Sequence, residues 1–282
     1  MKREGGYTIV ETGLAIAVSA SLVLLTVGLG TMVGRRRFQD SLTTVQSFIQ
    51  TQYNEVRSGI NSRLADTTSN LLGCGTSGAG NNPRCYMMGR LLTVMPGTDG
   101  GIKSSYIVAK PSDPNHWPNT AYSGLQNLQT GVTLYAVTND TNDAGLNSSI
   151  KLFGYGSDVA SAWTIINGTV SSINPASANI ALLRSPTDGS MIIATNVGLQ
   201  TDTSSGTQRI TLRDSGTSQI NMDAADKLVL GIRNGTVGQQ GGLICIAGGD
   251  SSAGISNNNN VNLNDFATNS HSLIEACGNW EQ

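Results

Sequence analysis

The sequence predicts an α+β protein in which a long N-terminal α-helix packs on a β-rich antiparallel globular head. Two patterns indicate this class. An uninterrupted apolar run from Leu14 to Val33 is followed, as far as Leu64, by apolar residues at helical spacing. From residue 65 onward, short β-rich runs alternate with turn residues, which is typical of antiparallel sheets. This second part is long enough for one large β domain or two small ones.

The first element is an apolar run without charge from Thr12 to Gly34. Its core, Leu14 to Val33, would span about 30 Å as a helix, which is the thickness of the hydrocarbon core of a bilayer. A helix buried in a globular core is rarely so long and so uniformly apolar. The run therefore predicts a transmembrane segment at about residues 12–34.

Three interpretations of the N-terminus compete. The first is a secretory signal cut near Ala17-Val18-Ser19-Ala20, whose small residues fit the cleavage rule. Against it, the apolar run continues past this point and Glu11 lies where the apolar region of a signal should begin. The second is a plain single-span anchor. The third is a leader cut between Gly6 and Tyr7, because two glycines offer a peptidase an extended backbone without side chains.

The order of segments at this end is a basic leader that ends in two glycines, a short stretch with one acid, and about twenty apolar residues. The first two segments read Lys2-Arg3-Glu4-Gly5-Gly6 and Tyr7-Thr8-Ile9-Val10-Glu11. This order resembles the N-terminus of type IV prepilins and type II secretion pseudopilins. The resemblance covers about the first 35 of the 282 residues.

The chain departs from the pattern of this family in two places. The family usually has Phe directly after the cleavage site, where this chain has Tyr7. The helix-breaking Pro that the family carries in the apolar run is absent. Gly28 and Gly30 could replace it as a weak point, because each costs about 1 kcal/mol relative to Ala in a helix.

The resemblance implies roles for individual residues. Residues 1–6 are the leader that a prepilin peptidase removes between Gly6 and Tyr7, and the new amino group of Tyr7 is the expected site of N-methylation. Glu11 is the assembly residue, whose carboxylate pairs with the N-terminal ammonium of a neighbouring subunit. An unpaired carboxylate in an apolar bundle costs about 3 kcal/mol or more, so this pairing would fix the axial register.

A local role for the same acid is compatible with pairing. Thr8-Ile9-Val10-Glu11 fits the S/T-x-x-E capping box, and an acid in the first turn suits the helix dipole. The cap could serve the free subunit and the pair could serve the filament.

Arg35-Arg36-Arg37 follow the apolar run, whereas only Lys2 and Arg3 precede it. Counted alone, these charges favour a cytoplasmic C-terminal part. Long domains are translocated with little regard to flanking charge, however, and the resemblance implies a head outside the cytoplasm. The arginines could pair with acids of adjacent subunits or with lipid phosphates, or simply mark the membrane border.

The helix is expected to continue past the membrane. Apolar residues recur at steps of three and four at Phe38, Leu42, Val45, Ile49, Tyr53, Val56, Ile60 and Leu64. This is one face of a helix with a 3.6-residue period, and no proline occurs before Pro83. We therefore predict one helix of about 85 Å over residues 7–64, apolar all round in its first half and packed on the head by its second half.

The head, residues 65–282, is expected to hold strands in an antiparallel sandwich or a related sheet-rich arrangement. The predicted strands are Leu91–Met95, Ile102–Lys110, Val132–Val137, Ile150–Tyr155, Trp163–Val170, Ile180–Arg184, Met191–Thr195, Arg209–Arg213, Leu228–Arg233 and Leu243–Ala247. Asn167-Gly168 and Asn234-Gly235 are two-residue hairpin signals. The predicted loops are Gly73–Pro83, Gly97–Gly101 and Ser251–Asn260.

Four cysteines, Cys74, Cys85, Cys245 and Cys277, allow three disulfide connectivities. Nearest-neighbour pairing would join Cys74 to Cys85 and Cys245 to Cys277, worth about 3 and just under 4 kcal/mol on the loop-entropy model. A bridge near the C-terminus also resembles the loop-closing disulfide of many pilins. A metal site is not expected, because no C-x-x-C is present and the histidines are His116 and His271.

The sequence does not predict an enzyme. It contains no G-x-S-x-G, P-loop or H-E-x-x-H motif, so neither catalytic residues nor a cofactor are expected. Asp250, Asp265 and the asparagine run do not match the spacing of a calcium loop. With a formal charge of −2 and 13% charged residues, the head offers no electrostatic basis for binding nucleic acid.

The resemblance then implies a structural subunit of a type IV pilus or pilus-like filament, a minor or large pilin whose head is displayed for adhesion. The expected partners are other pilin subunits in a homo- or heteropolymer, the prepilin peptidase, the inner-membrane assembly machinery and the membrane itself. The precursor would reside in the inner membrane and the mature chain in an extracellular filament. The alternatives are a single-span anchored surface binding protein that does not polymerise, and a secretion or competence pseudopilin.

Overall fold

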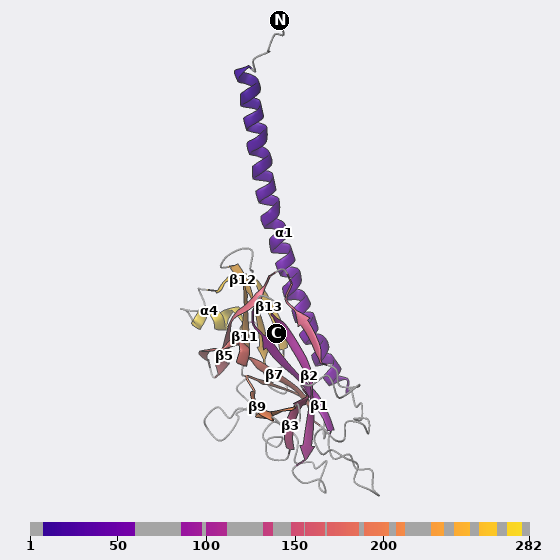
Figure 1. Ribbon diagram of the computed structural model, residues 1–282. Coiled ribbons are helices and arrows are strands. Elements are labelled where there is room, and N and C mark those ends of the chain that lie inside the picture. The colour runs from indigo at the N-terminus through magenta and orange to yellow at the C-terminus, as the bar shows by residue number, and fades with distance from the viewer. Residues whose placement is uncertain are drawn as a thin grey trace.

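The structure is a computed structural model that describes residues 8–59, 86–97, 100–111, 132–137, 148–154, 156–166, 168–185, 189–202, 207–211, 227–233, 240–248, 254–263 and 270–277. One long helix extends far beyond a head made of two antiparallel sheets (Figure 1). The predicted α+β class is confirmed.

The long helix α1 spans Ile9–Arg57, and Thr8 is its N-cap. The predicted helix reached Leu64, whereas the observed one ends seven residues earlier. Ser58 donates its backbone N–H to the carbonyl of Asn54, and Gly59 follows with a φ of 69°. A left-handed glycine after the last turn is a common helix terminator. Ile60 and Leu64, the last two residues of the predicted apolar stripe, lie outside the described residues.

The larger sheet has eight strands in the order β8-β7-β1-β2-β3-β10-β9, with β4 paired to one end of β2. Its strands are β1 (Tyr86–Met95), β2 (Gly101–Pro111), β3 (Val132–Val137), β4 (Ser149–Leu152), β7 (Asn179–Arg184), β8 (Met191–Thr195), β9 (Gly198–Asp202) and β10 (Thr207–Thr211). Its neighbouring strands pair antiparallel, including β1 with the distant β7.

The smaller sheet has five strands in the order β13-β12-β11-β5-β6, all paired antiparallel. Its strands are β5 (Asp158–Ile166), β6 (Thr169–Ile173), β11 (Lys227–Arg233), β12 (Gln240–Ala247) and β13 (Gly254–Asn262). A 3-10 turn, η4 (Pro175–Ser177), connects β6 to β7, and a short helix, α4 (Ser270–Ala276), follows β13.

The predicted strands are found with small shifts of their ends. The predicted strand Trp163–Val170 is in fact the hairpin of β5 and β6, in which Ile166 pairs with Thr169 and Gly168 has a φ of 75°. The Asn167-Gly168 turn signal was therefore correct. β11 and β12 also pair as neighbours, but the connection between them is residues 234–239, longer than a two-residue turn and outside the described residues.

Two strands, β9 and β13, were not predicted. The expected loop Ser251–Asn260 was wrong from Gly254 onward, because the asparagine run is part of β13. Asn257 pairs with Ile244 of β12, and its side-chain amide donates to Oε1 of Gln46 on α1 at 2.6 Å. The polar side chains are thus compatible with a strand at the end of the sheet that lies beside a helix.

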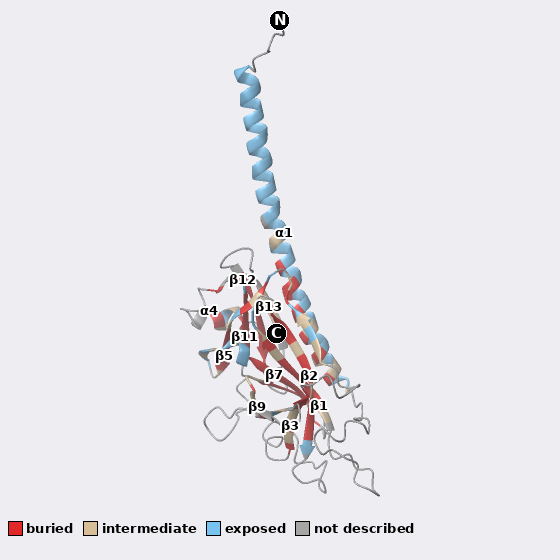
Figure 2. Ribbon diagram, viewed as in Figure 1, coloured by how far each residue is buried: buried red, intermediate tan, exposed pale blue. Residues whose placement is uncertain are grey.

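The second half of α1 belongs to the main core of the head. Phe38, Leu42, Val45, Ile49 and Val56 are buried together with apolar residues of both sheets, whereas the first half of the helix is exposed (Figure 2). The predicted stripe is confirmed over the described part. Each sheet therefore packs against the helix as well as against the other sheet.

Two further apolar clusters cover the remaining sheet faces. One lies on the other side of the larger sheet and is built from β1, β2, β3, β7, β8 and β10. The other lies on the outer face of the smaller sheet, where Leu273 of α4 and Cys277, directly after α4, pack with Trp163 and Leu243. The predicted disulfide between Cys245 of β12 and Cys277 is present and closes this cluster. Cys74 and Cys85 lie outside the described residues.

Polar contacts at intervals along α1 add direction to the apolar packing. Near its entry into the head, the hydroxyl of Ser41 accepts the backbone N–H of Gly154 at 3.1 Å. Further along, Gln46 donates to the carbonyl of Ile255 while it accepts from Asn257. These side chains fix the rotation of α1, because apolar contacts alone are not directional.

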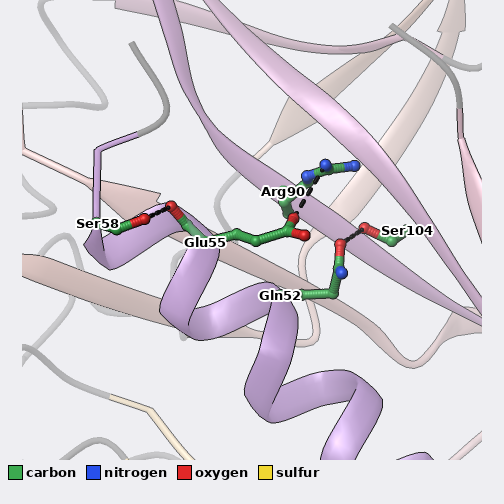
Figure 3. A network of polar contacts seen from close by, with 5 residues as sticks. All are labelled: Gln52, Glu55, Ser58, Arg90 and Ser104. Carbon is green, nitrogen blue, oxygen red and sulfur yellow. Dashed lines mark hydrogen bonds and ion pairs between the residues drawn. The ribbon is translucent and has the colours of Figure 1, made fainter. Parts of the chain in front are cut away.

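The last turns of α1 hold a half-buried ion pair (Figure 3). Glu55 lies 3.1 Å from the guanidinium of Arg90 on β1, whose side chain is 9% exposed and lies over the ring of Tyr106. One turn earlier, the hydroxyl of Ser104 donates to Gln52 at 2.6 Å, and both residues are buried. The helix is thus joined to β1 and β2 by a half-buried ion pair and by a buried hydrogen bond.

The close approach of α1 to β12 gives a test of this packing. A Cβ at Gly242 would lie 2.3 Å from a methyl group of the fully buried Leu42. We expect Gly242→Ala to lower the free energy of unfolding by about 1–3 kcal/mol through overpacking. Combination with Leu42→Ala should cost less than the sum of the two single changes, because the new methyl fills part of the cavity. Denaturant unfolding of the chain in detergent measures all three.

Gly154→Ala is the matched control, since the nearest atom to its Cβ would be the Ser41 hydroxyl at 3.9 Å. It should change the unfolding free energy by less than about 0.5 kcal/mol. Equal costs at the two glycines would contradict the contact between Leu42 and Gly242.

The Glu55–Arg90 pair gives a second test. Glu55→Gln leaves the guanidinium of Arg90 buried without its charged partner, so we expect a loss of about 1–3 kcal/mol in unfolding free energy. Asp158→Asn removes the same charge from the pair with Arg233, whose side chain is 53% exposed, and should cost less than about 1 kcal/mol. If both variants unfold at the same denaturant concentration, the Glu55–Arg90 pair contributes no more to stability than the exposed pair does.

Candidate functional site

The first half of α1 carries apolar side chains that the described part of the head does not cover. Thirteen large apolar residues of this half are exposed, by 45% to 91% of their surface. They are Ile9, Val10, Leu14, Ile16, Val18, Leu22, Val23, Leu24, Leu25, Val27, Leu29, Met32 and Val33. A patch of this size on a single chain indicates a surface that binds lipid or another protein.

These residues surround the helix, and they are not confined to one face. Leu22, Val23, Leu24 and Leu25 are consecutive and are all at least 58% exposed. Since successive residues of a helix are about 100° apart, four in a row face every direction. An amphipathic helix that lies on a membrane surface would have a polar face here. By length and composition α1 could cross a membrane, and no part of its most apolar stretch is buried against the rest of the protein.

Glu11 lies at the beginning of this surface and is held by the predicted capping box. Its carboxylate Oε2 accepts the backbone N–H of Thr8 at 2.9 Å and the Thr8 hydroxyl at 3.1 Å. The backbone N–H of Glu11 donates to the same hydroxyl at 3.4 Å. The local interpretation of the T-x-x-E motif is therefore confirmed. Both oxygens remain at an exposed helix end, where a cation of another molecule can approach.

The cap is independent of the predicted processing. Gly6 and Tyr7, the predicted cleavage and N-methylation positions, lie outside the described residues. The capping box uses atoms of Thr8 and Glu11 alone. Cleavage between Gly6 and Tyr7 would leave these atoms in place and would bring a new amino group to within one residue of Thr8.

The residue types that bind metal ions do not gather in the described part of the chain. Within it, no group of three or more His, Cys, Asp and Glu side chains could hold a metal ion. A cavity of about 30 Å³ lies at the end of α1, lined in part by Val56, Arg90, Tyr106 and Arg184. It is large enough for water but not for a metabolite. His116 and the side chain of His271 lie outside the description.

Sequence reasoning found the residues of this surface because all of them are local to one helix. It missed the groups that orient the helix on the head. The signals were too weak: Arg90, Tyr106 and Asn257 are distant from α1 in sequence, and a lone polar residue in a strand does not identify its partner.

The chain was compared with protein families, curated proteins and solved structures, and no match was found in any of the three comparisons.

The disulfide gives a test of the support for α4. Replacing both Cys245 and Cys277 by Ala should lower the unfolding free energy by about 4 kcal/mol, because the bridge closes a loop across 32 residues of sequence. The same loss should appear when the wild-type chain is unfolded with reductant. A variant as stable as the oxidised protein would show that the bridge contributes nothing to the head.

Proposed function

We propose that the chain is a structural subunit of a type IV pilus or a pilus-like filament. The observation that carries this proposal is the apolar half of α1, exposed on every side and fixed to the head by its other half. Such a rod can lie in lipid as a precursor and then exchange lipid contacts for contacts with the same half-helix of neighbouring subunits. The prepilin-like N-terminus supports the same conclusion.

Glu11 is the residue that would make this exchange specific. A plain membrane anchor has no need of a carboxylate at the N-terminal end of its apolar helix. An assembly of such helices can use one to set the axial register between neighbouring subunits. In the proposed filament the N-terminal ammonium of Tyr7 in one subunit pairs with Glu11 in the next. The carboxylate already accepts bonds from Thr8, so the incoming ammonium either joins or replaces them.

The head would be displayed outside the cell in this proposal. The buried disulfide supports an oxidising compartment, because such bridges are rare in the cytosol. The length of the chain favours a minor or large pilin, with adhesion or surface contact as the role of the head. A non-polymerising anchored binding protein is the second candidate, and it accounts for the apolar half-helix but gives Glu11 no role beyond the cap.

Processing separates the two candidates. Mass spectrometry of the mature chain should find Tyr7 at its N-terminus, with an added methyl group on the amino nitrogen. A mature chain that still carries residues 1–6 contradicts the proposal.

Substitutions at Glu11 separate its two roles. Glu11→Gln keeps an oxygen that can close the capping box but removes the charge, whereas Glu11→Ala removes both. We expect both variants to insert in the membrane and both to be lost from sheared surface filaments by at least about tenfold, the ratio that 1.4 kcal/mol of lost pairing produces. Asp40→Asn, the next acid on α1 and also exposed, is the control and should enter filaments normally.

If Glu11→Gln assembles like the wild type and Glu11→Ala does not, the cap rather than the charge is what assembly needs. If both assemble, the pairing role is wrong.

A further inference from the structure

The border between the two halves of α1 carries a group of cations that the proposed function does not use. Arg35, Arg36 and Arg37 are consecutive and exposed, and they directly follow Gly34, the last residue of the uncharged segment. Neither Arg35 nor Arg36 has an ion pair with any described carboxylate. The apolar run from Thr12 to Gly34 contains no acid, and the first acid after the arginines is Asp40, one turn beyond Arg36.

The position of this group along the helix is set by two lengths. The uncharged segment from Thr12 to Gly34 is about 35 Å long as a helix, slightly more than the hydrocarbon thickness of a bilayer. Phe38, the first buried residue of α1, comes three residues after Arg35. When the apolar half lies in a membrane, the arginines therefore lie in the headgroup layer on the side of the head, with the head close to that surface (Figure 2).

Arg35 and Arg36 point in different directions around the helix. At about 100° per residue, Arg36 lies about 160° around the helix from Phe38, and Arg35 lies about 60° from it. Phe38 marks the side that packs on the head. Arg36 is thus directed away from the head, whereas Arg35 lies on the head side about one turn before the packed part begins. Because both side chains are exposed, both can reach what surrounds the helix at this depth, which in the membrane is the phosphate layer.

We propose that Arg35 and Arg36 bind the phosphate groups of anionic phospholipids in the leaflet next to the head. A guanidinium presents its N–H groups as a fork that matches two phosphate oxygens, and its apolar stem can remain against the acyl chains. The bound lipid fixes the depth of α1 in the membrane and holds the head near the surface. This inference rests on the membrane-inserted state in the proposed function, but not on polymerisation.

The experiment titrates phosphatidylglycerol into the full chain in a neutral detergent and counts the lipids retained by native mass spectrometry. The wild type should retain phosphatidylglycerol in preference to phosphatidylcholine. Arg35→Gln/Arg36→Gln should raise the dissociation constant for phosphatidylglycerol by about fivefold for each arginine removed. This is the effect expected of one cation at an anionic surface. Arg35→Lys/Arg36→Lys should lie between the two.

Two double variants are matched controls. Arg57→Gln/Arg209→Gln removes the same charge from exposed positions of the head end and should bind as the wild type does. Lys2→Gln/Arg3→Gln removes the cations at the other end of the apolar run and should also retain the lipid. Unchanged binding by Arg35→Gln/Arg36→Gln, or an equal loss in either control, overturns the proposed site.

A parallel assay of resistance to carbonate extraction from vesicles reports membrane insertion and so tests the proposed function separately. If Arg35→Gln/Arg36→Gln retains phosphatidylglycerol but no longer enters filaments, the arginines contact acids of a neighbouring subunit, and the lipid site is wrong.

Discussion

The packing of one face of α1 into the core shared by both sheets is the constraint on which the rest of the molecule depends. Leu42, Val45 and Ile49 are completely buried between the sheets, so the second half of the helix cannot leave without opening the head. Because a helix is continuous, the first half is then held in a fixed direction away from the head. Its apolar surface has no way to fold back, and it must be covered by something other than this head.

The polar groups along α1 make this arrangement specific. Ser41, Gln46, Gln52 and Glu55 each contact a different strand or loop, at intervals down the packed half. A rotation or slide of the helix would leave buried donors and acceptors unpaired, which costs more than the bonds themselves contribute. The head therefore determines the direction in which each arginine projects from α1, and where along the molecule the apolar half begins.

Local patterns in the sequence predicted most of the helix, the strands and the capping box. The apolar stripe from Phe38 to Val56 could be recognised in the sequence, because burial of one helix face makes apolar residues recur with the helical period. The end of the helix was missed because Ile60 and Leu64 continue that period, whereas Gly59 with its left-handed backbone ends the helix. β13 was missed because asparagines disfavour strands in isolation, and here the side chain of Asn257 has a partner in Gln46 on α1.

The division of the strands into two sheets could not be predicted, because it depends on contacts between distant segments such as β1 with β7. The same holds for Arg90, which has no local signal of its ion pair with Glu55. The apolar surface and Glu11, in contrast, follow from one continuous segment. What covers that surface is not a property of the isolated chain, so it has to be measured in the assembled state.

The most direct measurement is the accessibility of the apolar half of α1 in filaments free of lipid. Leu22→Cys and, separately, Arg209→Cys would be introduced, and sheared surface filaments would be treated with a water-soluble maleimide. We expect the chain to be present in these filaments, with the cysteine at position 22 protected and that at position 209 labelled. Equal labelling at both positions, or recovery of the chain from the membrane fraction alone, would contradict it.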